Sequence, residues 1–312
     1  MVTPTVAIVG SNMMDLITYY RDRMPKTGET IFGEDFEIGF GGKGANQGVA
    51  VSRLGGKVIM VTAVGDDLFG PLVKNNFLEN GISSKFIKTV PGKTSGVAPI
   101  FVDEKGRNSI FIIPGANYSL FPEDVIQAEE ELQKASFLLL QLEIPLETVY
   151  YAIDMAQKLN LKVILNPAPA QELEWNKIQS VFLLAPNESE LESLTGIPAD
   201  SFTHIQEGAS FLLEKGIKNV LVTLGEKGSA LFTPQESKEF AAYSVNSIDT
   251  TGAGDAFLGA LSFFLAEGKD IDEAINLSSA YAALSTTRRG TQKSFASREE
   301  FENWLKSYSS GA

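Results

Sequence analysis

Short apolar runs alternate with amphipathic segments along most of the chain. Apolar runs without a polar residue at every second position are typical of strands that are buried on both faces of a parallel sheet. The predicted strands are Thr5–Val9, Val58–Val64, Ser136–Leu142, Lys162–Leu165, Val181–Leu184 and Asn219–Thr223. The predicted helices, in which apolar residues recur with helical spacing, are Ala45–Leu54, Pro71–Asn80, Pro122–Gln133, Leu146–Leu159, Glu188–Leu194, Ile205–Lys215, Ala253–Ala266, Ile271–Thr286 and Ser297–Ser307. This alternation predicts an α/β fold with a central, mostly parallel sheet flanked by helices.

Two segments interrupt the alternation, at about residues 17–40 and 94–113. Both contain strand-like runs and turns but no helical pattern, and the second is centred on the turn DEKGRN. We expect them to pair into a small β-sheet that stands off the main body and acts as a lid over the strand ends. The chain shows no internal repeat and no linker-like stretch, so we predict one α/β domain over residues 1–312 with this lid.

The composition narrows the class of protein. The 312 residues are 44% hydrophobic and 21% charged, which is typical of globular proteins and excludes disordered and fibrous classes. The net charge is −13, and this argues against nucleic acids or anionic membranes as partners, because phosphate contacts need clustered Lys and Arg. A small phosphate ligand is still allowed, since backbone N–H groups can bind it without any cation.

Two residue types limit the chemistry further. The chain has no cysteine, which excludes disulfides, zinc–thiolate sites and cysteine nucleophiles. Its one histidine, His204, lies in an amphipathic segment and is interpreted as a surface residue. Any base is therefore expected to be a carboxylate and any metal ligand an oxygen. The N-terminus lacks the basic start of a signal peptide and the apolar runs are too short to span a bilayer, so we expect a cytoplasmic protein, with the nucleus as the alternative.

The strongest chemical motif is DTTGAGDAF, which begins at Asp249. Gly252 and Gly254 allow the backbone to approach a ligand closely, and the helix predicted to begin at Ala253 has unpaired N–H groups in its first turn. Together they predict an anion hole for a phosphoryl group. Asp255 lies in that first turn, where it could accept a proton from an attacking hydroxyl. The alternative is that Asp255 is only a favourable charge at a helix start.

A second glycine-rich motif, GFGGKGANQ, spans residues 39–47. It matches the G-x-G-x-x-G pattern of dinucleotide-binding proteins, but it is not in the first βα unit and lacks the expected acidic residue at the next strand end. The motif therefore favours a loop for a polar small molecule. Gly41 and Gly42 would allow close approach, Lys43 would donate and Asn46 would bond hydroxyls. A plain glycine turn before a helix is the alternative.

Polar residues follow several predicted strands, where ligands of parallel sheets usually bind. Asp15 can accept two hydrogen bonds from vicinal hydroxyls, as a sugar requires, and Glu143 lies at another strand end. For both, a capping or turn-forming role is the alternative. Asn187 and Glu190 have the spacing of a capping box. Their oxygens could instead face a hydrated Mg²⁺ ion.

The segment TLGEKG follows the strand predicted to end at Thr223. Through Thr223, Gly225 and Gly228 it could lie along the phosphates and ribose of a nucleotide. By itself such a segment is more often an ordinary β-turn.

Five motifs, in this order and spacing, resemble the ribokinase family of carbohydrate kinases: GFGGKGANQ, NPAPA, NESE, TLGEKG and DTTGAGDAF. The resemblance extends from AIVGSNMMDL to RRGTQKSF and so covers essentially the whole chain. It implies a ribokinase-like sheet flanked by helices, with a β lid over the sugar that also joins two copies as a homodimer. It further implies transfer of the γ-phosphoryl group of ATP to the 5-hydroxyl of D-ribose, which gives ribose 5-phosphate.

The resemblance also implies a role for each matching position. Asp255 would be the base, and Gly252, Ala253 and Gly254 would form the anion hole. The positions that would contact ribose are Met13, Asp15, Gly41, Gly42, Lys43, Asn46 and Glu143. The positions along the nucleotide are Asn187, Thr223, Gly225, Gly228, Gly254 and Ser279. Glu190 would act on Mg²⁺ through water, and a K⁺ ion beside the anion hole would be held by Asp249, Thr251, Ser285, Arg288, Gly290 and Ser294.

Two positions depart from the family pattern. Many ribokinases have Asn where this chain has Met13, and a methionine cannot make the same hydrogen bonds. Many have Asn where this chain has Ser279, which leaves the contacts to the base open. The alternatives are a kinase for 2-deoxyribose or another small sugar, a sugar-binding sensor without catalysis, and a dinucleotide-binding oxidoreductase.

Overall fold

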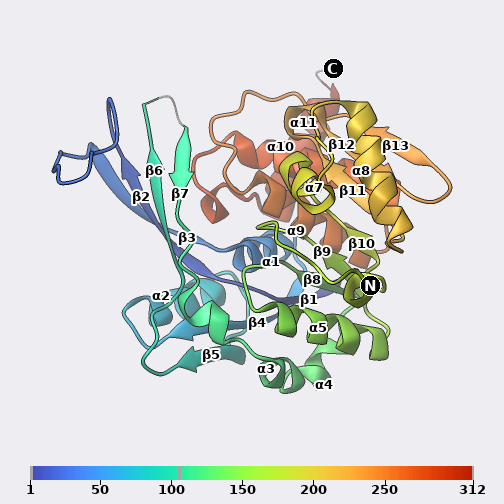
Figure 1. Cartoon of the computed structure of the whole chain (residues 1–312), viewed down its shortest axis with the longest axis horizontal. Coiled ribbons are helices and arrows are strands. Elements are labelled where there is room, and N and C mark those ends of the chain that lie inside the picture. The colour runs from blue at the N-terminus through green and yellow to red at the C-terminus, as the bar shows by residue number, and fades with distance from the viewer. Residues whose placement is uncertain (1–2, 105–106, 311–312) are drawn as a thin grey trace.

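The computed structural model describes residues 3–104 and 107–310 of the chain. The strands of its larger sheet are β1 Thr5–Val9, β4 Lys57–Gly65, β5 Phe86–Val90, β8 Phe137–Leu140, β9 Lys162–Leu165, β10 Leu183–Leu184, β11 Val220–Thr223, β12 Ser229–Phe232 and β13 Ser237–Phe240. They lie side by side in the order β13-β12-β11-β10-β9-β8-β1-β4-β5 (Figure 1). Neighbouring strands from β5 to β11 are parallel, and β12 and β13 are antiparallel additions at one edge.

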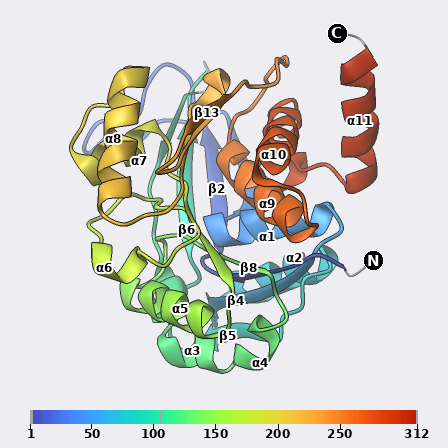
Figure 2. The same ribbon diagram turned by 90° about the vertical axis from the view of Figure 1, so that its right-hand side faces the viewer.

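Helices cover both faces of this sheet. Their bounds are α1 Lys43–Arg53, α2 Phe69–Glu79, α3 Pro122–Ile126, α4 Glu129–Leu132, α5 Leu146–Lys158, α6 Trp175–Ile178, α7 Glu188–Thr195, α8 Phe202–Glu214, α9 Ala253–Ala266, α10 Ile271–Thr286 and α11 Arg298–Ser310. Short 3₁₀ turns occur at η1 Gly115–Ser119, η2 Gly225–Lys227 and η3 Gln292–Ser294. Figure 2 shows the two helical layers, with α1, α2, α9, α10 and α11 on one side and α3 to α8 on the other.

The alternation of side chains in β1 explains why both layers bind the sheet. Val6 and Ile8 face the cluster that includes α1, α9 and α10, whereas Ala7 and Val9 face the cluster under α5 and α8. All four are fully buried. A strand that is apolar on both faces is stable only when both faces are covered. The predicted α/β fold, with its mostly parallel sheet flanked by helices, is thus confirmed.

A separate small sheet is built from β2 Met13–Tyr19, β3 Asp35–Gly41, β6 Val97–Val102 and β7 Asn108–Ile110, in the order β3-β2-β6-β7. It stands off one end of the main body (Figure 1). Its strands come from the two segments predicted to lack helices, but the first strand begins at Met13 rather than at residue 17. Within the turn DEKGRN, residues 105 and 106 lie outside the described part of the chain.

Some predicted elements were wrong in extent. The single helix predicted over Pro122–Gln133 is divided into α3 and α4, because the Ala128 N–H donates to the Val125 carbonyl, a tighter turn than in an α-helix. This turn lets Val125, Ala128 and Leu132 all enter the same buried cluster. The helix α8 begins at Phe202 rather than Ile205, since the Ser201 side chain caps it. The strands β5 and β13 and the helix α6 were not predicted, whereas β12 begins where a strand was expected, directly after TLGEKG.

Over the described ranges, no helix combines the length and the apolar character needed to cross a membrane. The cytoplasmic location and the exclusion of nucleic acids stay predictions.

Candidate active site

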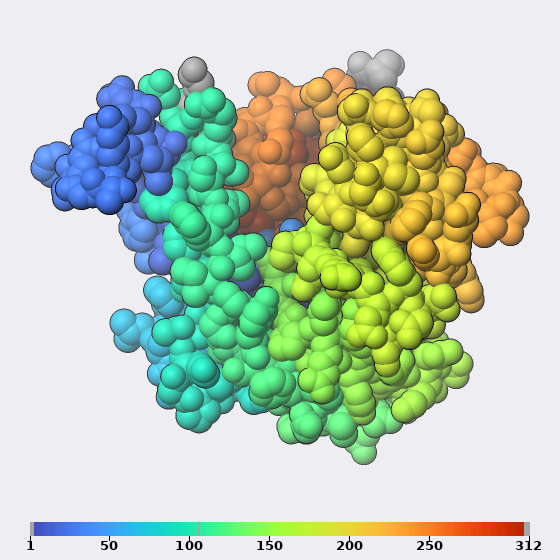
Figure 3. All heavy atoms as spheres, in the orientation of Figure 1, coloured from blue at the N-terminus to red at the C-terminus, as the bar shows by residue number. Residues whose placement is uncertain are grey.

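Side chains from both sheets meet where the main strands end. The loop after β1 carries Ser11, the segment after β8 carries Glu143, and Lys43 begins α1. Figure 3 shows a hollow on this side of the molecule, between the small sheet in blue and teal and the yellow segments around α7 and α8. Ligands of open α/β sheets bind outside the carboxyl ends of the strands, so this junction is the candidate site.

Asp255 lies in the first turn of α9 and is only 7% exposed. Its Oδ2 accepts a hydrogen bond from Asn46 Nδ2 at 2.8 Å, and its Oδ1 accepts one from Gln47 Nε2 at 3.1 Å. The structure therefore brings together two motifs that are far apart in the chain. The two N–H donors, one on each oxygen, fix the orientation of the carboxylate.

Gly252 gives the turn before α9 a left-handed backbone conformation, and the anion hole predicted for this turn stays a prediction. Gly252 has φ of 76°, and a Cβ there would overlap the methyl group of Thr291, so only glycine fits. A Cβ at Gly254 would meet nothing within 4 Å. The Ala253 N–H, which the resemblance assigned to the anion hole, donates to the Thr250 carbonyl at 3.2 Å.

Asp15 lies on β2, opposite Gly39 of β3, and faces the junction. Burial raises the pKa of Asp15 to about 7, and the charges of Glu143 and Asp255 add to the shift. A Cβ on residue 41 would lie 2.6 Å from the carboxylate carbon of Asp15. Gly41 is therefore needed to leave room for this carboxylate.

Glu143 connects the loop after β1 to the start of α1. Its Oε2 accepts hydrogen bonds from Ser11 Oγ at 2.5 Å and from the Lys43 backbone N–H at 2.9 Å. Burial raises the pKa of Glu143, which is 5% exposed. For the Lys43 ammonium, burial acts to lower the pKa, but the carboxylates of Asp255, Glu143 and Glu190 outweigh it and raise the pKa. Lys43 thus remains a cation among these acids.

The capping box predicted for Asn187 and Glu190 is confirmed. Asn187 Oδ1 accepts from the Glu190 N–H at 2.8 Å, and Glu190 Oε2 accepts from the Asn187 N–H at 2.9 Å. Burial raises the pKa of Glu190, while the bond from Asn187 and the charge of Lys43 oppose the shift. A role of Glu190 toward Mg²⁺ stays a prediction.

The segment TLGEKG lies beside this capping box. Thr223 forms an isolated parallel bridge with Asn187. Gly225 and Gly228 have φ of 57° and 99°, and a Cβ at Gly228 would overlap the backbone of Phe240. The turn therefore needs its glycines for its own shape, whichever ligand it contacts. Ser279 lies on α10 and is 9% exposed.

The residues predicted to hold a monovalent cation come from the loop before α9, which carries Asp249 and Thr251, and from the segment that runs from the end of α10 through η3. The Asp249 carboxylate joins them, because it accepts from the N–H groups of Thr251 and Gly290 at 2.9 Å each. The hydroxyl groups of Ser285 and Ser294 donate to backbone carbonyls. The Arg288 guanidinium lies 3.5 Å from Glu300 of α11. In residues 3–104 and 107–310, no three acidic or histidine side chains gather into a metal-binding group.

Four residues that hold the site together were missed by the sequence interpretation. They are Ser11, Gln47, Gln141 and Gln292. Gln47 lay in the motif GFGGKGANQ, and it could have been found because it directly follows Asn46. Ser11 and Gln292 lay in the two segments that bound the family resemblance, AIVGSNMMDL and RRGTQKSF, but no role was assigned to them. His204, in contrast, lies on the surface as predicted, where it bonds Asp200 at 2.6 Å.

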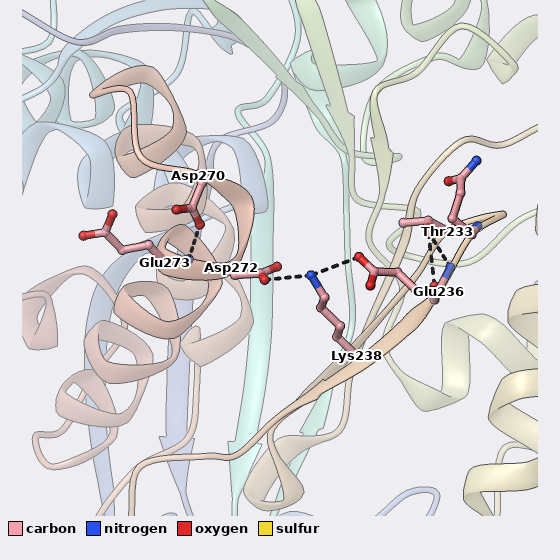
Figure 4. Close-up of polar contacts among 7 residues, drawn as sticks. Thr233, Glu236, Lys238, Asp270, Asp272 and Glu273 are labelled. Atoms are coloured by element: carbon pink, nitrogen blue, oxygen red, sulfur yellow. Dashed lines mark hydrogen bonds and ion pairs between the residues drawn. The ribbon is translucent and has the colours of Figure 1, made fainter.

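A second hollow of about 580 Å³ lies between β13 and the start of α10. Figure 4 shows that its lysine, Lys238, is held between Glu236 at 2.9 Å and Asp272 at 2.8 Å. Asp270 Oδ1 accepts from the backbone N–H of Glu273 and so caps α10. These groups bind one another, and none of the residues predicted for catalysis lines this hollow.

The geometry joins a glycine turn at a helix start, a buried carboxylate and a polar loop, and comparison with known proteins identifies the combination. A model of the pfkB family of carbohydrate kinases matches residues 3–298. The chain belongs to this family. Its ribokinase branch is indicated by ribokinase from Haemophilus influenzae, which is 41% identical over 280 residues, 90% of this chain and 92% of that protein. Deoxyribokinase from Salmonella typhi is 46% identical over 301 residues, 96% of this chain and 98% of that protein.

A solved structure supports the same assignment. Ribokinase from Arabidopsis thaliana, complexed with ribose and ATP, has a TM-score of 0.91 and 32% identity, covering 98% of this chain and 99% of that chain. The predicted membership of the ribokinase family is thus confirmed, and the protein is a carbohydrate kinase. Its sugar is left open, because both ribokinases and a deoxyribokinase are among its relatives.

Proposed function

We propose that this carbohydrate kinase transfers the γ-phosphoryl group of ATP to the 5-hydroxyl of a pentose. The observation that carries the proposal is the Asp255 carboxylate, held by two amide donors in the first turn of α9, directly after the glycine turn. The solved ribokinase complexed with ribose and ATP supports the choice of substrates. A sugar-binding sensor would not need a buried carboxylate at the phosphate end of the site.

The reaction needs little covalent chemistry from the protein. Asp255 takes the proton of the 5-hydroxyl as the bond from that oxygen to the γ-phosphorus forms. The bond from the γ-phosphorus to the bridging oxygen breaks, and ADP leaves. The positive end of α9 and the Lys43 ammonium balance the charge on the transferring group. The small sheet would close over the sugar and exclude water.

Two ions fit the donors present. The predicted K⁺ site offers the Asp249 carboxylate, hydroxyl oxygens and backbone carbonyls, a set of hard oxygen donors that suits such a cation. Arg288 could contribute only its carbonyl, because its side chain pairs with Glu300. Glu190 would meet Mg²⁺ through water, since its two oxygens already accept bonds from Asn187. Bound there, the ions would fix the anion-hole loop and neutralise phosphate charge.

For the sugar, we propose 2-deoxy-D-ribose as the preferred substrate. Met13 lies two residues before Asp15 on β2, so both side chains are on the same strand face. Met13 is 2% exposed and packs with Ala98 and Ile100. A thioether beside the sugar-binding carboxylate cannot satisfy a hydroxyl, and a hydroxyl left without a partner costs binding energy. The 46% identity to a deoxyribokinase supports this choice.

D-Ribose, the sugar expected from the sequence, is the second candidate. It is supported by the 41% identity to a ribokinase and by the structural match to the ribose complex. An apolar contact rejects an added hydroxyl only weakly, by roughly 10- to 100-fold. We therefore expect ribose to be a slower substrate rather than an inert one.

The deciding experiment compares kcat/KM for 2-deoxyribose and ribose in wild type, Met13→Asn and Met13→Leu. Wild type should favour 2-deoxyribose, and Met13→Asn should move the ratio toward ribose by about tenfold, because the amide offers the missing hydrogen bonds. Met13→Leu is the matched control and should keep the wild-type preference. An unchanged ratio in Met13→Asn would assign the selectivity to other residues.

We also propose that the small sheet joins two copies of the chain. On β3, Phe36 and Ile38 are 54% and 49% exposed. By strand alternation they lie on the face opposite to Gly39, which pairs with Asp15. An exposed apolar patch of this kind is typical of an interface. Ile38→Glu should give a monomer in sedimentation experiments, whereas Glu37→Gln on the other face should leave a dimer intact. A wild-type monomer would refute the proposal.

A further inference from the structure

Two chains of buried side-chain amides end on the Asp255 carboxylate. The first chain runs from α2 through η3 to α1. Asn76 Nδ2 donates to Gln292 Oε1 at 2.9 Å, Gln292 Nε2 donates to Asn46 Oδ1 at 3.0 Å, and Asn46 Nδ2 donates to Asp255 at 2.8 Å. These amides are 6–8% exposed, so water does not readily replace a lost partner.

The second chain reaches the other carboxylate oxygen. Gln141 Nε2 donates to Gln47 Oε1 at 2.6 Å, and Gln47 Nε2 donates to Asp255 Oδ1 at 3.1 Å. Both glutamines are fully buried. A Cβ on Gly10 would overlap the Gln141 side-chain oxygen, so the glycine at the end of β1 makes room for this amide. The chain is thus built into the packing of the strand ends.

Both chains have the same direction. Gln292, Asn46 and Gln47 each accept a bond from an amide farther from Asp255 and donate one toward the carboxylate. Gln47 Nε2 also donates to Asn166 Oδ1 at 3.4 Å. A side-chain amide has an acceptor oxygen on one side and a donor NH₂ group on the other. When a neighbouring donor binds the oxygen, the NH₂ group is directed to the opposite side. Gln292 therefore fixes the orientation of the Asn46 amide, and Gln141, together with the acceptor Asn166 Oδ1, fixes that of the Gln47 amide.

We propose that Gln292 and Gln141 are positioning residues for catalysis. Without the Gln292 donor, the Asn46 amide is free to rotate and present its oxygen to the carboxylate, which is repulsive. The carboxylate then loses the orientation needed to take the proton of the sugar hydroxyl. In a low-dielectric interior such aligned bonds also polarise one another. This inference rests on the proposed role of Asp255 as the base.

The direction of the chain gives a specific prediction for Gln292. Gln292→Glu keeps the size of the side chain but replaces the donor with a second acceptor, which favours the wrong orientation of Asn46. Gln292→Met removes the donor without adding an acceptor. We expect kcat to fall about 10- to 100-fold in Gln292→Glu and less in Gln292→Met. The KM for ATP should stay within about threefold in both.

Gln141→Met tests the second chain in the same way. It should lower kcat about tenfold with little change in the KM for ATP. Gln179→Met is the matched control for the substitution, because Gln179 donates to the Lys215 carbonyl at 2.9 Å, away from the site. Its kcat should equal that of wild type. Thermal unfolding of each variant shows that the protein compared is folded at the assay temperature.

The outcomes separate this inference from the proposed function. If Asp255→Asn keeps near-normal turnover, the base is assigned wrongly and the proposed function fails. If Asp255→Asn is inactive but both Gln292 variants keep wild-type kcat, only the positioning role fails. An equal loss in the Glu and Met variants also overturns it, because a purely structural role depends on packing and not on the direction of the hydrogen bonds.

Discussion

The two sheets of this protein hold their functional side chains in different ways. The larger sheet is buried on both faces under extensive clusters, and Asp255 is fixed there by amide donors. The small sheet, which carries Asp15, has a cluster of three buried residues, Met13, Ala98 and Ile100, with the partly buried Ile17 and Val102 packed against it. Asp255, the proposed proton acceptor, is therefore held in a fixed orientation by its neighbours. Asp15, the proposed sugar-binding carboxylate, depends on a small sheet with little hydrophobic core of its own.

The substitution with the largest expected effect tests Asp255, the site residue beside the larger sheet. Asp255→Asn should lower kcat by about 10²–10⁴-fold, because the amide cannot accept the proton of the hydroxyl. Sugar binding measured by calorimetry should persist, since the side chain keeps its size. Asp200→Asn, at an exposed position, is the control and should have wild-type kcat. Turnover within about threefold of wild type in Asp255→Asn would contradict the role of base.

The next effect tests the small sheet through two of its glycines. Gly41→Ala forces a methyl group against the Asp15 carboxylate. Overpacking of this kind costs about 1–3 kcal/mol, so the KM for the sugar should rise about tenfold or more. At Gly39 a Cβ would lie 3.5 Å from the Asp15 Cβ, an ordinary contact, and Gly39→Ala should change the KM by less than about threefold. Equal effects of the two substitutions would remove Asp15 from the sugar site.

A third pair of substitutions distinguishes a glycine that the backbone conformation of the turn requires from one that contacts a ligand. Gly252→Ala should destabilise the fold by about 1–2 kcal/mol or more, because its φ of 76° is costly for alanine. Gly254→Ala meets no protein atom within 4 Å, so its melting temperature should match that of wild type. Its kcat/KM for ATP should nevertheless fall several-fold if a phosphate lies against this residue. Full activity of Gly254→Ala would argue against the anion hole.

The smallest effect concerns the pH dependence of stability. The pKa of Asp15 rises from its ordinary 3.8 to about 7 on folding, so the folded chain binds more protons than the unfolded chain in this range. Its contribution to stability is therefore lost as the pH rises from about 4 to 7. Asp15→Asn should melt a few degrees above wild type at about pH 8, and this gain should shrink toward pH 5. Melting curves at several pH values check the trend, and a gain independent of pH would contradict it.

The sequence predicted the elements with strong local patterns. The bounds of β1, β9, α9 and α10 agree with the prediction, because each is a sustained apolar run or a helix with clear signals at its ends. The edge strand β13 was missed, since its residues SKEF are mostly polar and exposed. Such a strand forms because β12 offers it backbone partners, and this information is not local to its own residues.

The residues of the candidate site also fall into those that local motifs predicted and those whose contacts depend on distant parts of the chain. Asp255 and Gly252 were predicted from one short motif, because a glycine turn and the helix after it are local features. Asn46 was predicted as a site residue, but the hydrogen bonds that link the amides to one another and to Asp255 were not, since Gln47 and Asp255 are 208 positions apart and Asn46 and Gln292 are 246 apart. A buried glutamine has no distinctive pattern in a single sequence.

By itself the sequence determined the α/β fold class, the helix start that carries Asp255, and the membership of a carbohydrate kinase family. The tertiary structure alone decided which amides orient that aspartate and why position 41 has room only for glycine beside Asp15. It also decided which apolar residues of the small sheet stay exposed. The physical reason is that turn and helix signals act over a few residues, whereas hydrogen bonds and steric fit in the interior join residues that only folding brings together.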